Sequence, residues 1–204
     1  MNIRNISLSS AAVITLLAAF PVQAQDYRAQ AIAMMKKDFH TKGIASADRL
    51  NQDGLLAVCN RSNDKPPKEI AEQLQKDQEA TNKYPADGKL MGDWKSGEKI
   101  AQGGRGMTWS DKPGEAAGGS CYNCHQIGPK ETSFGTVGPS LYQFGKIRGY
   151  GADIQKYAYG KIYNSKMTNL CSNMPRFGHS GTLNEQQIKD LVALLMDPKS
   201  PVNQ

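Results

Sequence analysis

The clearest hydrophobic pattern lies near the C-terminus, between residues 185 and 196. Four apolar side chains recur there at i, i+3, i+4 and i+7, the spacing of one face of an α-helix. They are Ile188, Leu191, Val192 and Leu195. Asn184 and Gln187 form a capping-box pattern at the start, and Pro198 follows the end. The pattern predicts a helix over 185–196 whose apolar face packs in a core.

Weaker patterns of the same period predict further helices. Those in the second half cover 97–103 and 152–163, and those before them cover 27–39, 48–60 and 67–83. The segment 25–91 is too polar to form a core of its own, so it must pack on something else. Its own neighbouring domain and a partner subunit are both open, and we expect mostly a partner. We therefore divide the chain into an N-terminal helical extension, 25–91, and a domain, 92–204.

The first 24 residues have the pattern of a secretory signal peptide. Arg4 supplies the positive charge, residues 11–20 the apolar run, and Val22-Gln23-Ala24 a small-x-small cleavage site. The run is shorter than the ~20 residues that a membrane span needs. No Cys follows it, which argues against a lipid-anchored lipoprotein. We expect export, cleavage after Ala24 and, in a bacterium, a periplasmic location, where disulfides persist.

The net charge of the chain indicates which class of partner it would bind. Without Arg4 the formal net charge falls from +6 to +5, with 24 basic against 19 acidic residues. The chain has no polybasic block, so a mild basic excess favours an acidic protein partner over nucleic acid. We expect no membrane-spanning segment.

Residues 121–125 read Cys-Tyr-Asn-Cys-His, the C-x-x-C-H signature of covalent haem c attachment. On a helical turn, positions i, i+3 and i+4 project from nearly one face, so Cys121 and Cys124 can each form a thioether while His125 reaches the iron. A zinc site would need further Cys or His, and the chain has only four Cys and three His. A redox disulfide would need a βαβ context, which the Gly-rich flank does not offer. We expect one haem c per chain.

The second axial ligand should be a soft or imidazole donor from the later half of the chain. Met174 is our choice over Met167, because Pro175 biases it toward extended geometry in a loop. His179 is the competing imidazole. A His/Met pair fills both axial positions, which favours electron transfer over bond-making at the iron.

Cys59 and Cys171 remain after haem attachment, and we expect them to form one disulfide in an oxidising compartment. Two buried thiols, a bond to a partner and a sulfur-carrying Cys are the alternatives. A disulfide would tie the extension to the loop that carries Met174.

Five segments resemble SoxX, the small mono-haem subunit of the SoxXA cytochrome of bacterial thiosulfate oxidation. They are Tyr84 with Asp93-Trp94-Lys95, Gly97-Glu98, Gly135 to Leu141, Cys171 to Gly178, and the end from Ala193 to Asn203. The haem motif is common to cytochromes c, and the stretch from Cys171 to Gly178 discriminates best. The resemblance covers the whole domain 92–204 and, more loosely, part of the extension.

The resemblance implies an all-α fold, a class I cytochrome c-like domain with an N-terminal helical extension, in which the Pro139 carbonyl holds His125. It also implies a place in an L-cysteine S-thiosulfotransferase. SoxXA joins thiosulfate to a cysteine of the carrier SoxYZ and releases two electrons. The catalytic haem belongs to the SoxA-like partner, so we expect no catalytic residue in this chain. SoxX passes an electron to a soluble cytochrome acceptor.

Two other functions remain open. A free-standing soluble electron carrier would share every haem feature, and co-purification with a larger haem protein would separate the two. A catalytic or ligand-binding cytochrome would need a weakly ligated iron, which carbon monoxide binding to the reduced protein would reveal.

Overall fold

The computed structural model describes residues 26–204, so the predicted signal peptide lies outside the described residues. Within this range the chain is all-α, as the sequence predicts: it has seven α-helices, four short 3₁₀ turns and no named strand. The described residues also contain an isolated bridge between Lys42 and Ala45. The α-helices are α1 (Tyr27–Asp38), α2 (Gly54–Arg61), α3 (Lys68–Ala80), α4 (Trp94–Gln102), α5 (Phe144–Arg148), α6 (Ala152–Tyr163) and α7 (Glu185–Met196).

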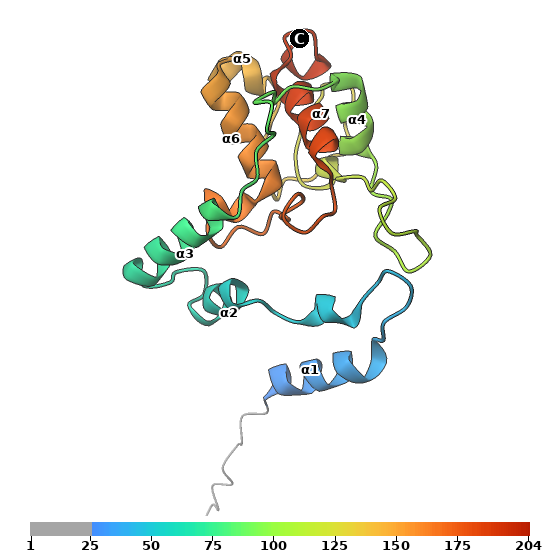
Figure 1. Ribbon diagram of the computed structural model, residues 1–204, viewed down its shortest axis with the longest axis vertical. Coiled ribbons are helices and arrows are strands. Elements are labelled where there is room, and N and C mark those ends of the chain that lie inside the picture. The colour runs from blue at the N-terminus through green and yellow to red at the C-terminus, as the bar shows by residue number, and fades with distance from the viewer. Residues whose placement is uncertain (1–25) are drawn as a thin grey trace, which may run out of the picture. The chain divides into compact units, whose positions relative to one another are not determined.

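The chain divides into two compact units between Asp38 and Phe39. Helix α1 is the described part of the first unit, and none of its residues is buried. All other helices belong to the second unit (Figure 1). The boundary predicted at residue 91 stays a prediction.

Helix α7 forms the centre of the second unit. Its capping box is present as predicted: the Gln187 N–H donates to Asn184 Oδ1 at 2.9 Å, and the Asn184 N–H donates to Gln187 Oε1 at 3.1 Å. Helices α4, α5 and α6 contact it and cover its apolar residues (Figure 1). Gly97 lets α4 approach closely, because a Cβ at this position would overlap the backbone of Asp190 on α7.

Two expected elements differ in detail, and one helix was not expected. The predicted helix 48–60 is two elements, a 3₁₀ turn at Ala47–Leu50 and then α2. The break arises because Asp53 is the N-cap of α2 and accepts a hydrogen bond from the Leu56 N–H at 2.7 Å. The predicted helix 97–103 begins earlier, at Trp94, where Asp93 caps it. Helix α5 was not expected from its sequence.

Helices α2 and α3 enclose a small second core. Leu55, Cys59 and Leu170 are buried in it, with Ala71, Leu74 and Cys171 packed around them. Asn164, fully buried after α6, donates to Thr81 Oγ1 at 2.8 Å at the end of α3. Helices α2 and α3 therefore pack in part on residues 164–177 of their own chain, which supply apolar surface to them. The expectation that the extension lies mostly against a partner subunit stays a prediction.

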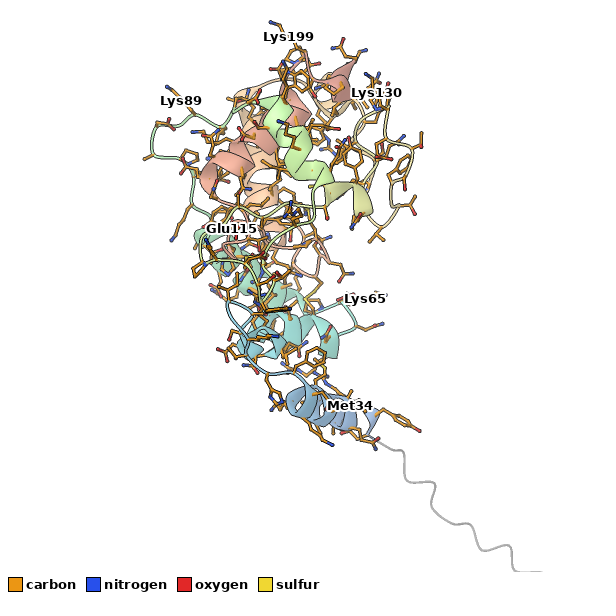
Figure 2. The ribbon with its side chains drawn as sticks, turned by 90° about the vertical axis from the view of Figure 1, so that its right-hand side faces the viewer. Met34, Lys65, Lys89, Glu115, Lys130 and Lys199 are labelled. Atoms are coloured by element: carbon orange, nitrogen blue, oxygen red, sulfur yellow. A yellow bond between two sulfur atoms is a disulfide. The ribbon has the colours of Figure 1, made fainter. Side chains whose placement is uncertain are left out.

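Lysines project from the surface of the second unit. Figure 2 shows the side chains of Lys65, Lys130 and Lys199 pointing away from the ribbon, and all three are exposed.

Among residues 26–204, no helix has the length and apolar character to cross a bilayer.

Candidate functional site

The C-x-x-C-H loop (residues 119–141) opens with a 3₁₀ turn over Cys121–Asn123 rather than the α-helical turn that the sequence suggested. Ser120, just before it, has a left-handed φ of 46°. The Cys124 N–H donates to the Cys121 carbonyl at 3.1 Å, and the His125 N–H donates to the same carbonyl at 2.9 Å. These two hydrogen bonds close a short turn that carries both thiols and the imidazole.

Later residues of the loop fold back on this turn. The Gly135 N–H donates to the Tyr122 carbonyl at 2.9 Å, and the Gly138 N–H donates to the Cys124 carbonyl at 2.8 Å. The C-x-x-C-H loop is therefore held mostly by its own backbone, which fixes where Pro139 lies relative to His125.

His125 Nδ1 lies 2.7 Å from the carbonyl oxygen of Pro139, the contact that the resemblance implies. A carbonyl only accepts, so this contact requires the proton on Nδ1 and leaves the Nε2 lone pair available to bind a metal. Gly138 lies against the face of the ring, where a Cβ would overlap the imidazole. Both contacts orient the His125 ring.

Cys121 and Cys124 are both free thiols, half-buried, and are not bonded to each other. Burial raises the pKa of the Cys121 thiol to about 12, so it is a neutral thiol at pH 7. Cys121 also borders the main hydrophobic core. Both sulfurs thus remain available for a covalent bond.

Tyr122, between the two cysteines, anchors the motif from within. Its side chain is buried, and its hydroxyl donates to Glu98 Oε1 at 2.9 Å and accepts from the Gly128 N–H at 3.0 Å. Burial, together with the Glu98 carboxylate, raises the pKa of Tyr122. These two hydrogen bonds join the C-x-x-C-H motif to Glu98 of α4 and to Gly128, which follows the motif.

The second candidate ligand, Met174, lies on another loop. We call residues 171–177 the Met174 loop. Met174 is half-buried and packs against the main core that Cys121 also borders. Its carbonyl accepts from Ser165 Oγ at 2.6 Å, and its N–H donates to Ser172 Oγ at 3.1 Å. The C-x-x-C-H loop and the Met174 loop therefore both line one apolar core.

The Met174 loop is tied to α2 at both of its ends. Cys171 forms a disulfide with Cys59, with Cα atoms 5.5 Å apart. Arg176 forms an ion pair with Asp53. The side chain of Lys166 donates to the Ser172 carbonyl, and burial followed by the nearby Arg176 charge lowers its pKa. The loop is thus held from two directions.

The competing ligands are occupied or exposed. The Met167 sulfur contacts the side-chain amide of Asn82 and lies against Gly160 of α6. His179 is exposed, and its pKa is lowered by partial burial and then by the Arg176 charge. Neither Met167 nor His179 is among the residues that pack against the main core, as Met174 does.

Comparison with known protein families gave no matching family model. One relative is an "Uncharacterized lipoprotein" of Aquifex aeolicus, 38% identical over 156 residues, which cover 74% of this chain and 73% of the relative. The chain belongs to the family of this Aquifex protein. The match spans about three quarters of each of the two proteins, so it is not limited to one short motif.

The candidate ligand residues of this chain are of the types that a haem c requires. Two unpaired thiols, an imidazole with Nε2 available and a thioether beside the same core are the set that covalent attachment and six-coordinate iron require. Cys121, Cys124, His125 and Met174 are the residues that would hold such a group.

Sequence reasoning missed three supporting contacts: the Tyr122–Glu98 hydrogen bond, the Asp53–Arg176 ion pair and the position of Gly138 on the imidazole. The sequence did mark one of these residues, Asp53, although not its pairing with Arg176. Asp53 precedes an apolar run and is a preferred N-cap residue, which would have placed the start of α2 correctly.

Proposed function

We propose that this chain is an exported mono-haem c-type cytochrome and the electron-transfer subunit of a SoxXA-like complex. The observation that carries the proposal is the hydrogen bond from His125 Nδ1 to Pro139, which leaves Nε2 for iron within a C-x-x-C-H motif. The domain 92–204 would then be a class I cytochrome c-like domain carried by an all-α chain.

Cys121 and Cys124 would form the two thioether bonds, one to each vinyl side chain of the porphyrin. His125 would supply the nitrogen ligand through Nε2, and Met174 the sulfur ligand. A haem iron held in this way exchanges one electron between its ferric and ferrous states. The residues contribute orientation and exclusion of water, because both loops border the main core.

Export is part of the proposal. The Aquifex relative is named a lipoprotein, and the N-terminal sequence of this chain has signal-peptide character. The first Cys of this chain is Cys59, and it is in a disulfide, so we do not extend a lipid anchor to it. A disulfide agrees with the periplasm.

As a SoxXA-like subunit, the chain would receive an electron released when a SoxA-like partner joins thiosulfate to the carrier SoxYZ, and would pass it to a soluble cytochrome. Support comes from the donor set of His125 and Met174, which would supply both protein ligands to the iron and would leave no open site for a substrate. The basic excess agrees with acidic protein partners.

The test is expression of the full chain with its leader in a host that matures c-type cytochromes. The expected product is one covalently bound haem per chain, which stays attached in denaturant. Changing both Cys121 and Cys124 to Ser should abolish this attachment. A wild-type chain that matures without covalent haem would refute the proposal.

Complex formation is tested separately, by purifying the tagged chain from its own cells. A larger haem-containing subunit should accompany it in a fixed ratio. A haem-loaded chain that purifies alone would identify a free-standing carrier, and one that binds carbon monoxide at neutral pH would identify a ligand-binding cytochrome.

A further inference from the structure

Helix α2 contacts the Met174 loop at two points on either side of the candidate ligand. Cys59 on α2 is bonded to Cys171, three residues before Met174. Asp53, the N-cap of the same helix, is paired with Arg176, two residues after it. The six-residue spacing between Asp53 and Cys59 corresponds to ~9 Å along a helix axis. One short rigid element therefore holds both ends of this loop.

The ion pair is better placed than an ordinary surface pair. The Arg176 side chain is 19% exposed and that of Asp53 is 40% exposed. Asp53 is itself fixed, because its other oxygen accepts from the Leu56 N–H at 2.7 Å. A charge pair with one partner preorganised and partly shielded from water loses less to side-chain entropy and screening.

The opposite side of the loop is held by the turn after α6. Ser165 Oγ donates to the Met174 carbonyl at 2.6 Å, and the Lys166 ammonium donates to the Ser172 carbonyl. The backbone around Met174 is thus fixed between α2 and this turn. The thioether needs little further ordering to meet a ligand on the core side.

We infer that Asp53 and Arg176 are positioning residues for Met174, acting through α2. The inference rests on the proposed function, in which Met174 binds iron. Neither residue touches the iron. The pair restricts where the Met174 loop can move, and so it raises the fraction of molecules in which the thioether is bound. The N-terminal extension then has a role within the cytochrome itself, in addition to any role at a partner.

The test uses the full haem-loaded chain and three variants. Asp53→Asn removes the charge but keeps a good N-cap, so α2 stays capped. Arg176→Gln removes the other charge, and Arg176→Lys keeps it. The measured quantities are the Met–iron charge-transfer absorption of the ferric protein and the fraction of reduced protein that binds carbon monoxide.

Asp53→Asn and Arg176→Gln should each raise the carbon monoxide-reactive fraction by up to about fivefold, the equivalent of about 1 kcal/mol for a partly exposed charge pair. Arg176→Lys should restore most of the protection. The matched control is Asp87→Asn, which removes the ion pair of a half-exposed aspartate with Lys189 of α7 at 3.8 Å and should change nothing.

Failure can be assigned. A wild-type protein that binds carbon monoxide completely would overturn the Met174 ligand and, with it, the inference. A protected wild type with Asp53→Asn equal to Asp87→Asn would overturn the inference alone. Hydrogen exchange of the haem-free chain gives a second measurement: Asp53→Asn should speed exchange in residues 171–177 and not in 119–141. Equal exchange of residues 171–177 in Asp53→Asn and Asp87→Asn would contradict the positioning role of Asp53.

Discussion

The C-x-x-C-H loop and the Met174 loop border the same core but are stabilised in opposite ways. The partners of the first lie close in sequence: His125 and Pro139 are 14 residues apart, and Tyr122 and Glu98 are 24 apart. The second also has nearby partners in Ser165 and Lys166, but its two contacts with α2 join distant residues. Cys59 and Cys171 are 112 residues apart, and Asp53 and Arg176 are 123 apart.

This difference has a consequence for each loop. A locally closed loop keeps its shape as long as its own backbone bonds persist, because little chain entropy opposes them. A loop held by distant residues depends on the tertiary contacts that bring α2 to it. We therefore expect disturbances of α2 to affect Met174 while His125 and the two thiols remain in place.

The largest effect should come from removing the disulfide. Changing both Cys59 and Cys171 to Ser opens a loop of 112 residues, which the chain-entropy account of cross-links values at ~4–5 kcal/mol of unfolding free energy. Denaturant unfolding of the wild type and the double variant measures this loss. Covalent haem should still be attached, and Met174 ligation should weaken.

The control for this variant is Ser at Cys59 alone and at Cys171 alone. Each should lose nearly as much stability as the double variant, because either change breaks the same bond. A double variant with unchanged stability and Met174 ligation would show that the two loops do not differ as proposed.

Next in size is truncation of Met174 itself. Met174→Ala should lower the unfolding free energy of the haem-loaded protein by ~2 kcal/mol, since a partly buried thioether and its contacts are lost. It should also admit carbon monoxide and lower the reduction potential, with the haem still attached.

Met167→Ala is the matched control. It removes a methionine of similar exposure whose sulfur contacts Asn82. It should destabilise the chain without admitting carbon monoxide or changing the potential. If Met167→Ala admitted carbon monoxide and lowered the potential while Met174→Ala did not, Met167 would be the ligand.

The sequence predicted what local patterns encode. The helix 185–196 and its capping box follow from apolar periodicity and from Asn184, and both are confirmed. The segment 48–60 was misjudged because the apolar pattern continues across a point where Asp53 caps the backbone. Helix α5 has only five residues, too short for a period to show.

The candidate site divides in the same way. The C-x-x-C-H motif could be identified from its spacing, and its carbonyl partner Pro139 from the resemblance to known cytochromes. The Asp53–Arg176 pair joins two exposed-looking charges over 123 residues, and nothing in a single sequence marks such a pair. The packing of α2 and α3 on their own chain could not be predicted for the same reason: their apolar partners, such as Leu170, lie in a distant segment.

Within the C-x-x-C-H loop, Tyr122→Phe tests how local the support is. It removes the hydroxyl that donates to Glu98 and accepts from the Gly128 N–H, at a buried position. The expected loss is ~1–2 kcal/mol of unfolding free energy, with a lower yield of covalent haem and no change in Met174 ligation. Tyr142→Phe, which removes an exposed hydroxyl bonded to Gln204, is the control and should have no effect.

The smallest expected effect is a pH dependence that separates the two loops. Partial burial raises the pKa of Asp53, but the hydrogen bond from the Leu56 N–H and the Arg176 charge outweigh it, so the folded pKa lies below the ordinary value of 3.8. A depressed carboxyl pKa stabilises the fold above the unfolded value, and this contribution is lost as pH falls through the folded value.

The stability difference between wild type and Asp53→Asn should therefore be full near pH 6, begin to shrink as pH drops toward 4, and vanish below the folded pKa. Because Asp53 is partly exposed, we expect about 1 kcal/mol or less, and less still at high salt. Urea unfolding at several pH values measures the difference, with hydrogen exchange in residues 171–177 as the local measurement. A difference that stays constant down to the lowest pH would assign the effect of the substitution to capping of α2 and not to the charge on Asp53, and the Met174 loop would then owe nothing to its ion pair.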